Sequence, residues 1–131
     1  FADDQLGASI KQNSAEQSLN NYIEIYLKEA TVREGRMRAL YIIMGEALGA
    51  VPEIQESITQ LNQGVRGVLA TIIQKGIESG EFSADTNPEL SAVLIHGMLR
   101  GVVMQYLSDR KTIDIKKILP LVQSSAMKGL R

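Results

Sequence analysis

The sequence predicts an all-α fold, a helical bundle of about five to six helices. Apolar residues recur three and four positions apart along most of the chain, which is the helical period. Prolines and glycines fall where helices are expected to start and stop. No stretch alternates apolar and polar residues as a strand does, so an all-α class is favoured.

The composition fits one domain and excludes several kinds of site. The chain has 131 residues, a formal net charge of −1, one histidine and no cysteine. The net charge gives no general attraction to nucleic acid or anionic lipid. Without cysteine, disulfides and thiolate metal sites are excluded, and we expect a cytoplasmic protein with no metal and no cofactor. No signal peptide is visible, and the chain starts at Phe1 rather than Met, which suits a fragment.

Four complete helices are predicted before the final one, and three of them precede residue 81. Residues 14–30 start with a Ser14–Gln17 capping box. Residues 33–49 are expected to end at Gly49. Residues 52–79 begin at Pro52 and end before Gly80, which suits a left-handed turn position. Residues 1–11 read more weakly, as the end of a helix that started upstream.

The fourth of these helices, residues 87–107, is apolar on two faces. Asn87 is its predicted N-cap and Pro88 its first residue. A helix that is apolar nearly all round is buried nearly all round. We expect a subunit contact on at least part of it, with packing inside the chain as the alternative. His96, Arg100 and Gln105 argue against a membrane span.

The final helix is predicted over residues 114–128, capped by Asp114. Pro120 lies inside this segment. A proline inside a helix removes a hydrogen bond and collides with the preceding turn. We therefore expect either a kink or a helix that properly starts near Lys117.

Several short motifs then suggest a family. Residues 76–82 read Gly-Ile-Glu-Ser-Gly-Glu-Phe, residues 85–90 read Asp-Thr-Asn-Pro-Glu-Leu, and a long apolar helix with Gly97 and Gly101 follows. The order resembles the regulatory half of tetracycline-repressor-like (TetR) transcription regulators, over nearly the whole chain. The closing Met-Lys-Gly-Leu is similar to the end of that family's last helix.

The resemblance implies an effector-binding and dimerisation domain spanning residues 1–131. It implies a homodimer, in which the last two long helices of each subunit form a four-helix interface. The family's DNA-binding part normally precedes this domain, so we expect operator DNA to be bound only through that missing part. The expected interface residues lie on these two helices: Val93, Leu94, Gly97, Gly101, Met104, Ile118 and Val122.

A ligand site is predicted where aromatic, methionine and sparse polar residues share helix faces. Tyrosine has an apolar body with a polar group, and methionine adapts to irregular shapes. Mostly apolar cavities with few polar groups bind small molecules, so a small, largely apolar effector is expected. Ordinary core packing is the alternative for each residue. The candidates are Tyr22, Tyr26, Met37, Tyr41, Met44, Leu69, His96 and Arg100.

The sequence leaves two alternatives to a ligand sensor. The first is a helical dimerisation or adaptor module without a cavity. The second is a small helical enzyme, which would need converging carboxylates or His96 beside an acid. The spacing of charged residues shows no such group, and no phosphate-binding glycine loop is present. We therefore predict a non-enzymatic regulator whose effector changes the spacing of its DNA-binding parts.

Overall fold

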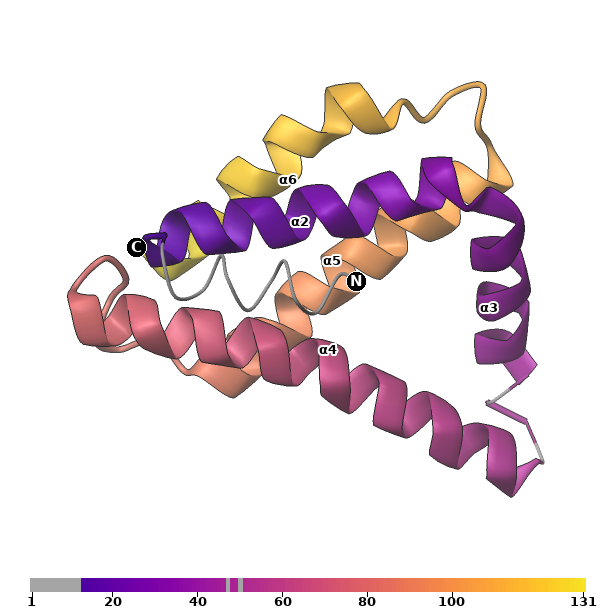
Figure 1. Cartoon of the computed structure of the whole chain (residues 1–131), viewed down its shortest axis with the longest axis horizontal. Coiled ribbons are helices and arrows are strands. Elements are labelled where there is room, and N and C mark those ends of the chain that lie inside the picture. Colours follow the sequence, from indigo (N-terminus) through magenta and orange to yellow (C-terminus); the bar gives the residue numbers. More distant parts are fainter. Residues whose placement is uncertain (1–12, 47, 50) are drawn as a thin grey trace.

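The computed structural model describes residues 13–131 except 47 and 50, and these residues form five helices (Figure 1). No strand occurs within this part of the chain, which confirms the all-α prediction. The helical end expected over residues 1–11 lies outside the described residues. The helices are α2 (Ala15–Val32), α3 (Glu34–Glu46), α4 (Pro52–Ser79), α5 (Pro88–Ser108) and α6 (Ile115–Leu130).

The helix ends follow the capping signals in the sequence. Gln17 N–H donates to the Ser14 hydroxyl, and Ser14 N–H donates to the Gln17 side chain, each at 3.1 Å. Gly80 follows α4 with a φ of 83°, a backbone conformation that costs glycine little. The Asn87 side chain accepts a hydrogen bond from Leu90 N–H at 3.0 Å.

Two helix boundaries differ from the predictions. Helix α3 ends at Glu46 instead of Gly49. The backbone forms a turn there, in which Gly49 N–H donates to the Glu46 carbonyl at 2.9 Å. The last helix begins at Ile115 and continues through Pro120, so a start near Lys117 is wrong. Its first turn forms because Asp114 accepts from Lys116 N–H at 2.9 Å.

The core lies where α2, α4, α5 and α6 meet. Helix α5 packs along α4, and α2 packs against α4, α5 and α6. Burying each large apolar side chain contributes about 1.5–3 kcal/mol. Helix α3 lies across one side, between the end of α2 and the start of α4 (Figure 1). The most enclosed apolar side chains are Leu19, Ile23, Leu27, Leu69, Ile72, Ile73, Leu99, Val103 and Leu130.

One end of the bundle is fastened by contacts between distant segments. We call it the closed end: the start of α2, the α4–α5 connection and the end of α6. The Glu81 carboxylate accepts the backbone N–H groups of Ala15 at 3.1 Å and Glu16 at 3.2 Å. Ser83 N–H donates to the Leu130 carbonyl at 2.9 Å.

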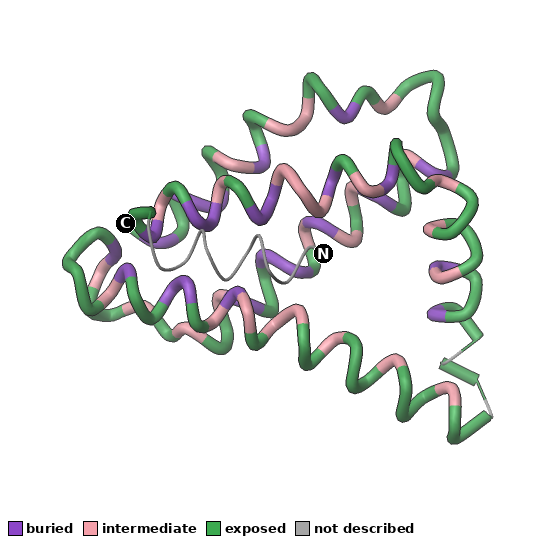
Figure 2. Tube along the Cα trace, viewed as in Figure 1, coloured by how far each residue is buried: buried purple, intermediate pink, exposed green. Residues whose placement is uncertain are grey.

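The other end is more loosely packed, and we call it the open end: α3 together with the first half of α4. All buried residues of α4 lie between Leu69 and Gly76, and its first half is exposed or half-buried (Figure 2). The two ends are therefore joined by one long helix whose fully buried residues all lie in its C-terminal half.

Helix α5 is the one described helix that is long and apolar enough to cross a membrane. This test uses length and composition only, and buried core helices also pass it. One face of α5 is packed into the core, through Ala92, Ile95, Leu99 and Val103. The finding is therefore weak evidence for a membrane span.

Candidate ligand-binding pocket

A pocket of about 460 Å³ lies at the open end, between α3, α4 and α5. This volume is within the range of small-molecule sites, roughly 300–1,000 Å³. Apolar and uncharged polar side chains make up nearly all of its wall, and Arg100 is its one charged residue. The lining residues are Tyr41, Met44, Gly45, Leu48, Gln55, Ile58, Thr59, Asn62, Arg100 and Met104.

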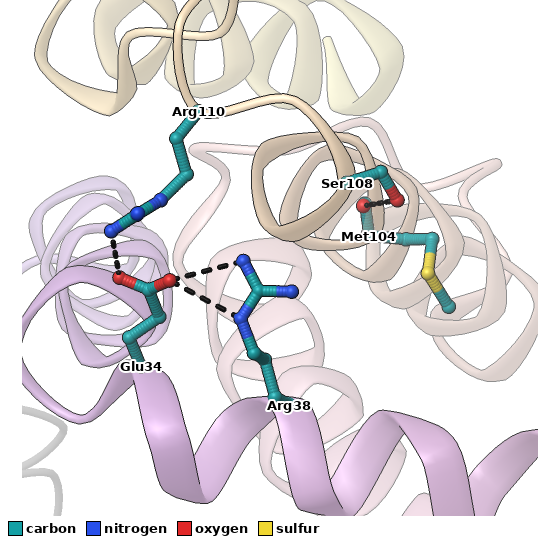
Figure 3. Close-up of polar contacts among 5 residues, drawn as sticks. All are labelled: Glu34, Arg38, Met104, Ser108 and Arg110. Carbon is teal, nitrogen blue, oxygen red and sulfur yellow. Dashed lines mark hydrogen bonds and ion pairs between the residues drawn. The ribbon is translucent and has the colours of Figure 1, made fainter.

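The wall from α3 is held in place at its first turn. The Glu34 carboxylate binds Arg38 one turn along at 3.1 Å and Arg110 of the α5–α6 connection at 2.7 Å (Figure 3). Exposed ion pairs of this kind contribute little stability, about 0–1 kcal/mol each. They orient the start of α3, whereas its later turns, which carry Tyr41 and Met44, face the pocket.

Arg100 enters the pocket from α5 and has only neutral partners there. Its Nη1 donates to Asn62 Oδ1 at 3.0 Å, and its Nη2 donates to Met44 Sδ at 2.7 Å. A thioether sulfur is a weak acceptor. Five ion pairs occur among the described residues, and none of them includes Arg100.

A row of aromatic side chains lies behind the pocket wall. The hydroxyls of Tyr26 and Tyr41 lie 3.3 Å apart and share a hydrogen bond. The Tyr26 ring packs against Tyr22 and, edge-on, against His96, each with ring centroids 6.3 Å apart. Burial raises the pKa of both Tyr26 and Tyr41, and the Arg100 charge offsets part of that rise. Both phenols therefore stay protonated at neutral pH.

His96 is neutral in this setting. It is 5% exposed, and burial lowers the pKa of its imidazole to about 4, with the charges of Arg100 and Arg66 acting in the same direction. A buried imidazole between two cations is a poor general base at pH 7. No group of three or more metal-binding side chains occurs in the described part of the chain.

The outer face of α5 is apolar and open to solvent. Leu90 is 64% exposed, Val93 49%, Leu94 74% and Met104 46%. Gly97 and Gly101 lie on the same face, and a Cβ added to either would meet no atom within 4 Å. The opposite face is packed inside the chain, so α5 carries two apolar faces with different neighbours.

The comparisons with known proteins agree with this architecture. The model of the family described as tetracyclin repressor-like, C-terminal domain, matches residues 40–119, which is more than half of the chain. The chain belongs to this family. Its members are regulators and not enzymes, so the predicted family and the non-enzymatic assignment are confirmed.

The TetR-like domain also matches a solved structure, that of the MbdR regulator from Azoarcus sp. CIB. The TM-score is 0.82 at 15% sequence identity, and the match covers 98% of this chain and 68% of MbdR. At this identity the match establishes the fold. A comparison with curated proteins finds no match.

The structure brings part of the predicted ligand set together. Tyr41, Met44 and Arg100 line the pocket, and Tyr26 and His96 stand behind it. The remaining predicted residues do not line it. Tyr22 and Leu69 are buried in the core, and Met37 is half-buried against that core.

Sequence reasoning expected α4 to border the cavity but missed the residues of α4 that line the pocket. Gln55, Ile58, Thr59 and Asn62 all line it, and they are spaced i, i+3, i+4 and i+7, which places them on one helix face. That spacing was the available signal. It was hidden because three of the four residues are polar and resemble a solvent-facing stripe.

The predicted interface residues separate into two groups. Val93, Leu94, Gly97, Gly101 and Met104 lie on the exposed outer face of α5, although Met104 also lines the pocket. On α6 the structure places both predicted residues toward this chain's own core. Val122 is 3% exposed and belongs to this chain's core, Ile118 is half-buried against that core, and the outward-facing residue is Leu121, 62% exposed.

Proposed function

We propose that this TetR-like domain senses a small, largely apolar effector in the pocket between α3, α4 and α5 and forms a homodimer through α5 and α6. The observation that carries the proposal is the double use of α5. Arg100 and Met104 of this helix line the pocket, and its outer apolar face lies next to them. A ligand in the pocket therefore touches the helix that we expect to contact a second subunit.

The pocket is favoured over a second hollow of about 510 Å³ at the closed end. That hollow is lined by Lys75, Glu78 and Glu81 together with several small polar residues. Sites for small apolar molecules are mostly apolar with few convergent polar groups. The pocket at the open end meets that description, and the more charged hollow does not.

The mechanism that we infer is a shift between two arrangements of the open end. A ligand changes such an equilibrium only if it binds one arrangement more tightly. The first half of α4 has few buried residues, so it can move at low cost when the pocket fills. In a protein that carries the family's DNA-binding part, the movement would alter the spacing of the two copies, and half-sites on DNA lie at fixed separations.

Ligand sensing is tested with a pair of matched glycine substitutions. Gly45 lines the pocket and Gly64 does not, and a Cβ at either meets no atom within 4 Å. We expect apolar compounds from a mixed panel to raise the melting temperature of wild type and of Gly64→Phe. The shift should disappear in Gly45→Phe, whose ring fills the pocket. A panel without any shift in wild type would favour the dimerisation or adaptor module.

The dimer is tested on the outer face of α5. Leu94→Glu places a carboxylate on this face, whereas Leu61→Glu places one on α4 at another exposed leucine. Burying an unpaired charge in an interface is strongly unfavourable. We expect size-exclusion chromatography with light scattering to show a dimer for wild type and Leu61→Glu and a monomer for Leu94→Glu. An unchanged dimer would rule out this face as the contact.

A further inference from the structure

We infer that the effector of this pocket is an amphiphile whose apolar body carries a single anionic group, a carboxylate, bound by Arg100. The inference rests on the proposed sensor function and specifies the ligand class for the same pocket. It starts from the charge of the wall. Ten residues line the pocket, and among them Arg100 is the only charged side chain.

The guanidinium of Arg100 has two hydrogen-bond acceptors but no charged partner among the described residues. Asn62 Oδ1 and Met44 Sδ are both neutral acceptors, and no carboxylate among the described residues pairs with the group. Arg100 is half-buried, and withdrawing a charged side chain from water is unfavourable unless it is paired. A carboxylate matches the planar fork of the guanidinium with two parallel hydrogen bonds, and it can displace the weakly accepting sulfur.

The positive charge of Arg100 also acts on the pKa values of the neighbouring titratable groups. The Arg100 charge pushes down the pKa of both Tyr26 and Tyr41, and with Arg66 it helps to keep His96 neutral. No acidic residue contributes to the shift of any of these three groups. An anion entering the pocket is therefore attracted by Arg100, and no carboxylate occurs among the described residues that line the pocket.

The rest of the wall suits an apolar body. Met44, Leu48, Ile58 and Met104 provide flexible or aliphatic surface next to Arg100, and methionine adapts to different ligand shapes. Leu48 is 89% exposed beside this wall. A bound aliphatic or aromatic group would cover it.

The test compares decanoate with decanamide, two compounds of the same length that differ in charge. Binding to the protein is measured by isothermal titration calorimetry for wild type, Arg100→Gln, Arg100→Lys and Arg36→Gln. Arg36 is an exposed residue of α3 outside the pocket, so its variant matches the change in net charge. We expect wild type to bind decanoate about tenfold more tightly than decanamide, because hydrogen bonds to charged groups contribute about 1.5–3 kcal/mol.

The pattern across the variants decides the inference. The preference for decanoate, measured as the ratio of the two dissociation constants for each variant, should vanish in Arg100→Gln, persist in Arg36→Gln and return in part in Arg100→Lys. Equal binding of both compounds to wild type would overturn the anionic ligand and leave the sensor function standing. A preference that survives Arg100→Gln would overturn the role of Arg100, and no binding of either compound would overturn the inference as a whole.

Discussion

The two halves of α4 differ more than any other two regions of the molecule. From Leu69 to Gly76 the helix is part of the core, and Gly76 lies so close to Phe82 that an added Cβ would stand 2.1 Å from its ring. From Pro52 to Gly67 no residue is fully buried (Figure 2). One half of the helix thus builds the fold, and the other half forms a wall around space that a ligand can enter.

The largest expected effect comes from placing the same substitution in each half. Gly76→Ala forces the Phe82 ring to move, and overpacking of this kind costs about 1–3 kcal/mol. Gly67→Ala meets nothing within 4 Å and should stabilise the helix by up to about 1 kcal/mol. Urea denaturation of both variants measures the difference. Equal stabilities would mean that the two halves are packed alike.

A second prediction concerns His96, the buried residue of α5 that stands behind the pocket. Its folded pKa is about 4, below the ordinary 6.5, so the unfolded chain takes up this proton first as the pH falls. Stability is present above pH 6.5 and is lost between there and pH 4; between pH 7 and pH 5 the loss is about 2 kcal/mol. The measurement is urea denaturation across this range, with His96→Gln as the control that lacks the slope. A wild-type slope no steeper than that of the control would place His96 in a wetter, more open environment.

The smallest expected effect concerns the cap at the closed end. Burial acts to raise the pKa of Glu81, but hydrogen bonds from Ser79, Ala15 and Glu16 outweigh it and lower that pKa below 4.5. The cap therefore stabilises the fold above pH 4.5 and ceases to do so as the pH falls through the lowered value. Because the carboxylate is exposed, Glu81→Gln should cost only about 0.5–1 kcal/mol at pH 7.

The pH dependence provides the check on that assignment. The stability difference between wild type and Glu81→Gln, measured by urea denaturation, should shrink between pH 7 and pH 3. Glu78→Gln is a suitable control, because Glu78 lies three residues before Glu81, near the end of α4, and its carboxylate accepts from Gln74. A difference that stays constant with pH would show that the charge of Glu81 contributes nothing to the cap.

The sequence predicted the closed end better than the open end, and the reason is physical. Capping residues such as Ser14, Asn87 and Gly80 act on their own neighbours, so local sequence is sufficient to find them. The buried face of α5 can also be predicted from local sequence, because its apolar residues recur with the helical period. Both kinds of signal are fixed within a turn or two of the chain.

The pocket required information that local sequence does not contain. Arg100 was identified as unusual, but its partner Asn62 lies 38 residues away, and only the crossing of α4 and α5 brings them together. On α6, adjacent residues point about 100° apart, so the rotation of the helix about its own axis decides that Leu121 is exposed and Val122 is buried. Tertiary packing sets that rotation.

The contacts at the closed end determine the order in which the chain can fold. Ala15 meets Glu81 across 66 residues, and Glu16 meets Arg131 across 115. Closing such long loops costs conformational entropy of the chain before the contacts at their ends can stabilise the fold. During synthesis, α2 therefore completes its packing only after α6 has been made, and loss of Leu130 and Arg131 would remove contacts with Ser83 and Glu16.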